Sequence, residues 1–113
     1  MATNVNKSAV AHARQLIRQG QVEKGHGDWS AHQPSTDQEN TFIDREGMEA
    51  FGKWYLGIET DQADQNKGHY KFPYGDFKRV HRGGLIAAKQ RAAQNHYDDI
   101  EKAADKLIAL IGE

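Results

Sequence analysis

Apolar residues recur at helical spacing at both ends of the chain. The first helix is predicted over residues 7–19, where one face carries Val10, Ala13, Leu16 and Ile17. Asn6 can cap its start, and Gly20 is placed to end it. The last helix is predicted to begin at Asp98, which forms a variant of the capping box with Glu101. Its apolar face carries Ile100, Ala103, Ala104, Leu107, Ile108 and Ile111.

Two further helices are predicted between these ends. One begins near Asp44 in DREGMEAFGKWYLGI, where the apolar positions at helical spacing are Met48, Phe51, Trp54 or Tyr55, and Ile58. It is the most hydrophobic of the predicted helices, so we expect it at the centre of the core. Each of its regularly spaced glycines costs about 1 kcal/mol relative to alanine, which favours close packing of a neighbour at Gly47, Gly52 and Gly57. The other helix follows two glycines in LIAAKQRAAQ, and the short joint after it predicts that the last two helices pack as a pair.

Two stretches lack helical periodicity. Residues 20–41 are polar and contain Gly and Pro, which predicts a long surface loop or a poorly ordered linker. Trp29 is the exception, and we expect it to anchor this loop on the core. In HYKFPYGDFKRVH, apolar and polar residues alternate around Gly75 and Asp76, which predicts a tight turn in an aromatic loop or a short β-hairpin. Pro73 argues against a central strand there.

The predicted fold class is mainly α: a small domain of about four helices with a short aromatic loop or β-hairpin before the third helix. At 113 residues, a single domain over 1–113 is the simplest organisation, with 42–113 as its main core. No apolar run approaches the roughly 20 residues that cross a bilayer. The N-terminus lacks the basic-then-apolar order of a secretory signal. We therefore expect a cytoplasmic protein without a membrane partner.

Charge changes this picture, because the near-neutral total of −1 hides a cationic middle. Residues 67–93 carry seven basic residues and one acidic residue, a net +6, while residues 1–66 carry −4 and residues 94–113 carry −3. Such asymmetry bears on partners rather than on fold. The predicted function is a small non-enzymatic interaction module that binds an acidic protein surface or a nucleic acid through this segment. The predicted binding residues are Lys71, Lys78, Arg79, His81, Arg82, Lys89 and Arg91.

Alternatives are open for the same segment. Its aromatic residues could stack on unpaired bases or be buried in the core, and they are Tyr70, Phe72, Tyr74 and Phe77. Its cations could instead pair with acids such as Asp98, Glu101 or Glu59, which would leave a purely structural domain with no ligand. An enzyme that uses His81 as acid or base would need a pocket joining it to a carboxylate and a tyrosine.

Most catalytic and metal chemistry lacks a motif in this chain. The absence of cysteine excludes disulfides, thiolate nucleophiles and Cys-type zinc sites. No serine lies in a G-x-S-x-G elbow, and no glycine-rich phosphate-binding motif is present. His26, Asp28 and His32 are metal-ligand types, but their H-x-D-x-x-x-H order matches no tight signature. We predict no catalytic residue, no metal site and no cofactor.

The run YKFPYGDFKRVHRGGLIAAKQRAAQ, continued by D-I-E-K-A-A at residues 99–104, resembles a small domain of unknown function found in short bacterial and phage proteins. In some of these proteins the domain accompanies phage prohead-protease sequences. The resemblance covers about half of the chain and is carried by F-P-Y-G-D-F, then V-H-R, then R-A-A-Q. It implies a bacterial or phage origin, and it brings no known activity, cofactor or catalytic residue.

Overall fold

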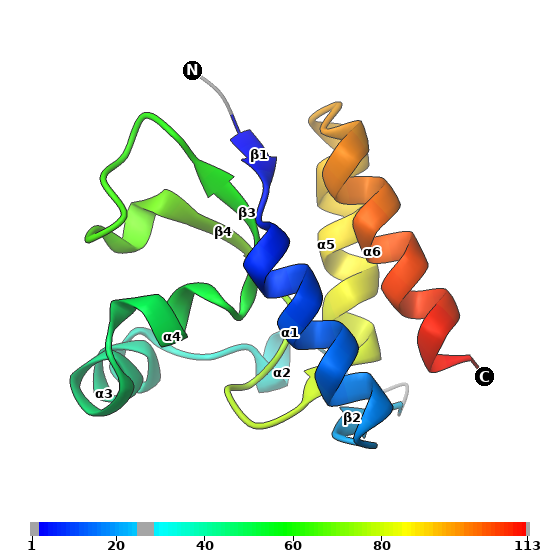
Figure 1. The fold of residues 1–113 in the computed structure, drawn as a ribbon, viewed down its shortest axis with the longest axis horizontal. Coiled ribbons are helices and arrows are strands. Elements are labelled where there is room, and N and C mark those ends of the chain that lie inside the picture. Colours follow the sequence, from blue (N-terminus) through cyan, green and yellow to red (C-terminus); the bar gives the residue numbers. More distant parts are fainter. Residues whose placement is uncertain (1–2, 25–28, 113) are drawn as a thin grey trace.

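The computed structural model describes residues 3–24 and 29–112, and Figure 1 shows how they are arranged. The first elements are β1 (Thr3–Val5), α1 (Lys7–Arg18), β2 (Val22–Glu23) and the short α2 (Trp29–His32). The middle elements are α3 (Thr36–Glu46), α4 (Met48–Gly52), β3 (Tyr55–Glu59), a 3-10 turn (Lys67–His69) and β4 (Tyr70–Pro73). The last elements are β5 (Val80–His81), α5 (Arg82–Gln94) and α6 (Asp98–Ile111).

The fold is mixed α/β and rich in helix, so the mainly α prediction is wrong. Helices hold 58% and strands 16% of the described residues. Strands β1, β3 and β4 form an antiparallel sheet in the order β1-β3-β4, and β2 pairs with β5 in parallel. The expected number of about four helices agrees with the structure. The sheet, however, goes beyond the single short hairpin that the sequence predicts.

The largest departure concerns the helix predicted from Asp44. Helix α3 begins earlier, where Ser35 and Gln38 form a reciprocal capping box with hydrogen bonds of 3.2 and 2.8 Å. It ends at Gly47, whose φ of 94° favours glycine. After the one-turn α4, residues 55–59 become the central strand because β1 and β4 pair with both of their edges.

Residues 20–41, expected to be a loop or a linker, contain β2, α2 and the start of α3 among those that the structure describes. Strand β2 is held by parallel pairing of Val22 with Val80. The Trp29 ring lies 3.1 Å from the point that a Cβ of Gly84 would occupy, at the start of α5. Its centroid is 5.3 Å from that of His81. The predicted anchoring role of Trp29 is therefore confirmed.

Helices α5 and α6 lie side by side against the sheet, and α1 packs against α6 (Figure 1). The predicted pairing of the last two helices is confirmed. The first helix also lies close to its predicted position. The capping box predicted at Asp98 is not formed, since the N-cap is Tyr97 and no side chain accepts a hydrogen bond there. Helices α3 and α4 pack against each other and lie apart from α5 and α6 (Figure 1).

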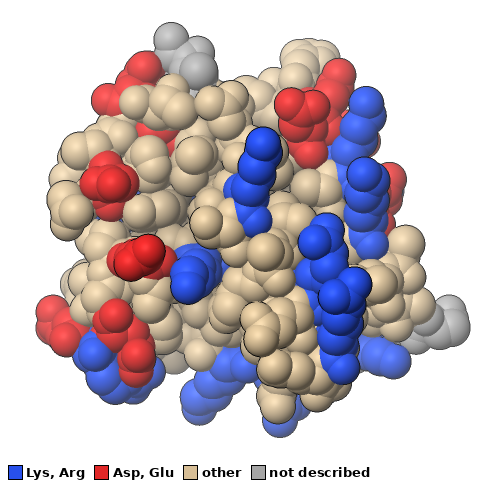
Figure 2. All heavy atoms as spheres, viewed as in Figure 1, with Lys and Arg blue, Asp and Glu red and all other residues tan. Residues whose placement is uncertain are grey.

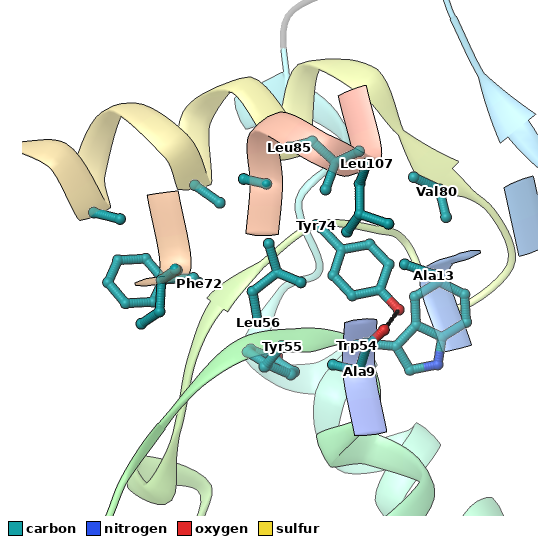
Figure 3. Packing of buried hydrophobic residues seen from close by; sticks show 14 of the residues in the cluster. Ala9, Ala13, Trp54, Tyr55, Leu56, Phe72, Tyr74, Val80, Leu85 and Leu107 are labelled. Carbon is teal, nitrogen blue, oxygen red and sulfur yellow. Dashed lines mark hydrogen bonds between the residues drawn. The ribbon is translucent and has the colours of Figure 1, made fainter. Parts of the chain in front are cut away.

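Tyr74 lies inside the core among side chains from α1, α5, α6 and the sheet (Figure 3). Its hydroxyl donates to the carbonyl of Lys53 at 2.6 Å and lies 3.5 Å from the carbonyl of Ala9. The Nδ1 atom of His12 lies 3.2 Å from the same hydroxyl. Because the hydroxyl is cut off from water, these partners replace its hydration. Burial also raises the pKa of Tyr74, which keeps the phenol neutral.

Candidate functional site

Two of the predicted binding cations are held in ion pairs. The Arg79 Nη1 atom lies 3.3 Å from Glu23 Oε1, and the Lys89 Nζ atom lies 2.8 Å from Asp105 Oδ1. The carboxylate of Asp105 raises the pKa of Lys89. Internal pairing, one of the alternatives for the cationic segment, thus accounts for part of its charge, although with acids other than those that the sequence suggested.

The remaining predicted cations do not form one surface. Lys71 and Arg91 line the same pocket beside the sheet. The exposed Lys78 lines a different pocket, together with residues of α3. Arg82 is half-buried at the start of α5, and its Nε has no hydrogen-bond partner among the described residues. The structure therefore brings Lys71 and Arg91 together and places the other cations elsewhere.

The aromatic residues of the segment are part of the core and do not form a base-stacking platform. Tyr74 is 0% exposed and Phe72 is 8% exposed. Phe77 stacks on Phe42 with ring centroids 4.4 Å apart, and Tyr70 packs against the buried cluster. Rings covered by the protein in this way offer little free face to an unpaired base. The buried alternative for these residues is the one that the structure supports.

His81 is buried at the end of β5, beside the rings of Trp29 and His32. Its Nε2 lies 2.9 Å from Asp76 Oδ2, yet the ring N–H is not directed at this oxygen as in a hydrogen bond. The pair is ionic only when the imidazole carries a proton on both nitrogens. The backbone connects His81 to a tyrosine, because the His81 N–H donates to the Tyr74 carbonyl at 3.0 Å. Of five pockets in the described part of the chain, none is lined by His81.

Asp76 holds the tight turn that the sequence predicts. Its Oδ1 accepts hydrogen bonds from the N–H groups of Lys78 and Arg79, at 3.0 and 2.9 Å, and Gly75 forms an antiparallel bridge with Val80. Burial by itself would raise the pKa of Asp76. The neighbouring His81 imidazole and the two backbone N–H donors outweigh it and lower the pKa below its ordinary value. These contacts give Asp76 a structural role.

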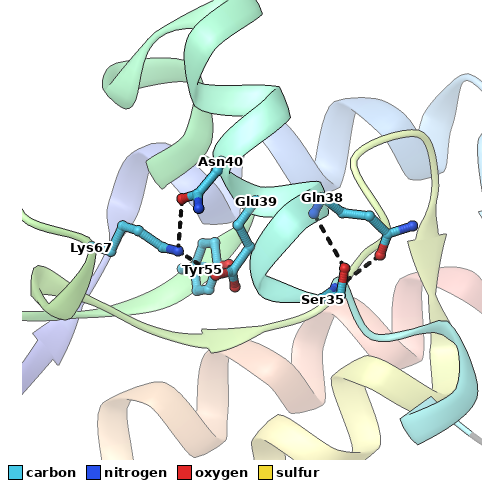
Figure 4. Close-up of polar contacts among 6 residues, drawn as sticks. All are labelled: Ser35, Gln38, Glu39, Asn40, Tyr55 and Lys67. Carbon is cyan, nitrogen blue, oxygen red and sulfur yellow. Dashed lines mark hydrogen bonds and ion pairs between the residues drawn. The ribbon is translucent and has the colours of Figure 1, made fainter.

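A polar cluster ties α3 to the sheet and uses another cation of the segment (Figure 4). The Tyr55 hydroxyl donates to Glu39 at 2.8 Å, and Lys67 lies 2.9 Å from the other oxygen of the same carboxylate. Lys67 also donates to Asn40 at 3.1 Å. Burial and the Glu39 carboxylate together raise the pKa of Tyr55, so the phenol remains a donor. Lys67 is thus a structural cation.

The largest of the pockets described here is a groove of about 590 Å³ between α1 and α6. Helical periodicity creates it, because residues three, four and seven positions apart fall on the same face of a helix. The groove residues from β1 and α1 are Val5, Lys7, Val10, Ala11 and Arg14. Those from α6 are Asp99, Lys102, Ala103, Lys106, Leu107 and Leu110. We call this surface the α1–α6 groove.

The α1–α6 groove has an apolar floor and a cationic rim. Figure 2 shows Lys and Arg side chains gathered over α1 and α6, whereas the acidic side chains on this face lie mostly over the sheet, α3 and α4 and near the start of α6. The four rim cations have no ion-pair partner among the described residues, and they are Lys7, Arg14, Lys102 and Lys106. Asp99 is the only acid among the residues that line the groove. Leu110, at its edge, is 44% exposed.

Local net charge is the reason that the sequence analysis missed this groove. Its cations lie in the two parts of the chain whose totals are −4 and −3. Helix α1 contains no acidic residue, and its packing against α6 places two short cationic stripes side by side. The spacing of Lys102 and Lys106, one helical turn apart, and of Lys7 and Arg14, two turns apart, is the signal that could have indicated it.

Other chemistry has little support among the described residues. They contain no group of three His, Cys, Asp or Glu side chains arranged to hold a metal ion. Two residues of the histidine-rich pattern, His26 and Asp28, lie outside the described residues. None of the helices in the described part of the chain has the length and apolar character needed to span a membrane.

No family model, no curated protein and no solved structure matches this chain. The resemblance to a small bacterial and phage domain therefore stays a prediction. Any functional conclusion must come from the surfaces of the molecule.

Proposed function

We propose that this protein is a non-enzymatic binding module, and that its α1–α6 groove docks an acidic amphipathic helix of a partner protein. The single observation that carries the proposal is a groove of about 590 Å³ with an apolar floor and four rim cations that lack an ion-pair partner within residues 3–24 and 29–112. The proposal keeps the predicted class of partner, an acidic protein surface. It places the contact in the α1–α6 groove instead of in residues 67–91.

The dimensions of the groove suit a short helix. Helix α1 has 12 residues and α6 has 14, so each presents a face about 18 to 21 Å long. A helix of three to four turns, laid along this groove, would bury leucines at i, i+3, i+4 and i+7 on the floor. Glutamates or aspartates on its flanks would then meet Lys102 and Lys106 on one side and Arg14 on the other.

A protein partner explains the groove better than a nucleic acid does. Phosphate binding requires cations but no apolar floor, and Leu107 and Leu110 would contribute nothing to it. The rings that could stack on bases are held in the core. The chain as a whole also carries a net charge of −1, which gives no general attraction for a polyanion.

Binding of a designed peptide tests the proposal. The probe is a helix of about 14 residues with leucines on one face and glutamates on its flanks, and the control is a peptide of the same composition in scrambled order. We expect the ordered peptide to bind and the scrambled one to bind at least about tenfold more weakly. Reversing charge with Lys102→Glu and Lys106→Glu should weaken binding by about tenfold or more. The matched control, Lys24→Glu with Lys78→Glu, changes net charge equally and should have little effect.

Leu110→Ser separates the two classes of partner. Because Leu110 is exposed, this substitution leaves the core intact. It should weaken binding of the peptide but not binding of a DNA duplex. Equal affinity for ordered and scrambled peptides would contradict the proposal. So would a DNA duplex that binds more tightly than the peptide and loses affinity steeply with salt.

A further inference from the structure

We propose a second site, for a small zwitterion of the amino-acid class, in the pocket between the sheet and the joint of α5 and α6. The pocket has a volume of about 320 Å³ and is lined by Thr3, Glu59, Lys71, Phe72, Arg91, Asn95 and Tyr97. It shares no lining residue with the α1–α6 groove. The proposal therefore stands independently of the proposed function.

The central observation is an unpartnered buried carboxylate oxygen. Glu59 is 8% exposed, and its Oε1 has no hydrogen-bond partner among the described residues. Within the described part of the chain, the other oxygen receives a single, long hydrogen bond of 3.4 Å from the Thr3 hydroxyl. A buried carboxylate without a donor is unfavourable, because it has lost its hydration and gained nothing equivalent. Because this oxygen is itself shielded from solvent, a rotation of the Glu59 carboxylate toward the pocket would let an ammonium group there supply the missing donor.

Two cations line the same pocket. Lys71 projects from the edge strand β4 and Arg91 from α5, and neither has a carboxylate within ion-pair distance among the described residues. Both were predicted from the sequence to contact an acidic protein surface or a nucleic acid. A carboxylate held between them would gain two charge-assisted contacts, of which the guanidinium can provide a bidentate one.

The charge arrangement selects a ligand that carries both signs. A simple amine would be attracted by Glu59 and repelled by two cations, whereas a simple carboxylate would be repelled by Glu59. A zwitterion places its ammonium against Glu59 and its carboxylate against Lys71 and Arg91. The rings of Phe72 and Tyr97, with centroids 6.0 Å apart, line the same pocket and provide apolar contact for a side chain. The volume is sufficient for a free amino acid and too small for a folded partner.

The test is a titration of the full chain, followed by two-dimensional NMR of its backbone amides. Each proteinogenic L-amino acid is added singly at millimolar concentration, and the strongest binder is compared with its N-acetyl derivative and its carboxamide. We expect the free amino acid to shift the amides of Thr3, Glu59, Lys71 and Asn95. Each derivative should bind at least about tenfold more weakly, since each lacks one of the two charges. This comparison uses the unmodified chain and does not depend on the folding of a variant.

Variants then assign the two ends of the ligand. Glu59→Gln keeps the size of the side chain, and it should weaken binding of the free amino acid by about tenfold. Binding of the N-acetyl derivative should not weaken and should increase, because its carboxylate no longer meets a like charge. Lys71→Gln combined with Arg91→Gln should weaken binding of the free amino acid. Binding of the carboxamide should not weaken and should increase, because its ammonium group no longer meets two like charges. Lys78→Gln, which removes an exposed cation outside the pocket, is the control. The proposal is overturned if no amino acid shifts these amides, or if the free and N-acetylated forms bind alike.

Discussion

At the scale of single residues, tertiary contacts reassign side chains that local rules would use differently. Asn6 occupies the N-cap position of α1 as the sequence predicts, yet its side chain makes no capping hydrogen bond. Its Nδ2 instead donates to the carbonyls of Gly52 and Tyr55, at 2.9 and 3.0 Å. These carbonyls lie where α4 gives way to β3, so Asn6 joins the N-terminal strand and helix to the centre of the fold. The residue at position 57 also depends on a tertiary contact, because a Cβ at Gly57 would lie 2.7 Å from the Phe72 ring.

Replacing Asn6 by alanine tests this role. The substitution leaves two buried carbonyls without donors, so we expect the free energy of unfolding to fall by about 2–4 kcal/mol. The exposed Asn4, on β1, provides the matched control, and Asn4→Ala should change stability by less than about 0.5 kcal/mol. Urea denaturation followed by circular dichroism measures both. Similar values for the two variants would show that the Asn6 contacts do not hold the fold together.

At the scale of elements, the position of α3 depends on its N-terminal cap and on the polar cluster of Glu39, Tyr55 and Lys67. The sequence TDQENTFIDRE has little apolar periodicity, and Phe42 is its only buried residue. Helix propensity alone does not fix such a helix. The Ser35 and Gln38 capping box defines its start, and Glu39, held by Tyr55 and Lys67, fixes it against the sheet. The pattern S-x-x-Q was present in the sequence and is a recognisable start signal.

Ser35→Ala removes the cap without disturbing a buried group. It should lower the free energy of unfolding by about 1 kcal/mol, because the N–H of Gln38 loses its acceptor. Thr36→Ala is the control, since its exposed side chain lies at the first helical position and makes no capping hydrogen bond. Thermal unfolding of the two variants in parallel gives the comparison. A cap that contributes nothing would leave both with the same midpoint.

At the scale of the whole molecule, buried titratable groups make stability depend on pH. His12 packs against Trp54, with ring centroids 5.0 Å apart, and contacts the Tyr74 hydroxyl. Burial is the main cause that lowers the pKa of His12 below its ordinary 6.5, and the Lys53 charge adds to it, while a hydrogen bond to the Lys53 backbone acts in the opposite direction. As pH falls through 6.5, the unfolded chain therefore binds a proton at His12 before the folded chain does. The resulting contribution to stability is complete above pH 6.5 and decreases below it.

His12→Gln removes this dependence while keeping a hydrogen-bond donor near Tyr74. We expect the midpoint of thermal unfolding to fall less between about pH 7.5 and about pH 5.5 in the variant than in the unmodified chain. His96→Gln, at an exposed position, serves as the control and should retain the original dependence. If both variants show the same loss of stability on acidification, His12 is not its source.

Local sequence patterns were sufficient to predict the elements whose residues repeat regularly and end at clear signals. Periodicity, glycines and local side-chain chemistry predicted helix α1, the pair of α5 and α6, the turn at Asp76 and the anchoring of Trp29. Strand β3 could not be predicted in this way, because the run WYLGI from Trp54 to Ile58 suits either a buried helix or a central strand. Only pairing with β1 and β4 decides between the two. The same holds for the candidate sites. The charge of residues 67–91 was visible in the sequence, but its division among ion pairs and separate pockets depends on distances between elements far apart in the chain. Both the α1–α6 groove and the pocket at Glu59 exist only once helices and strands are packed together.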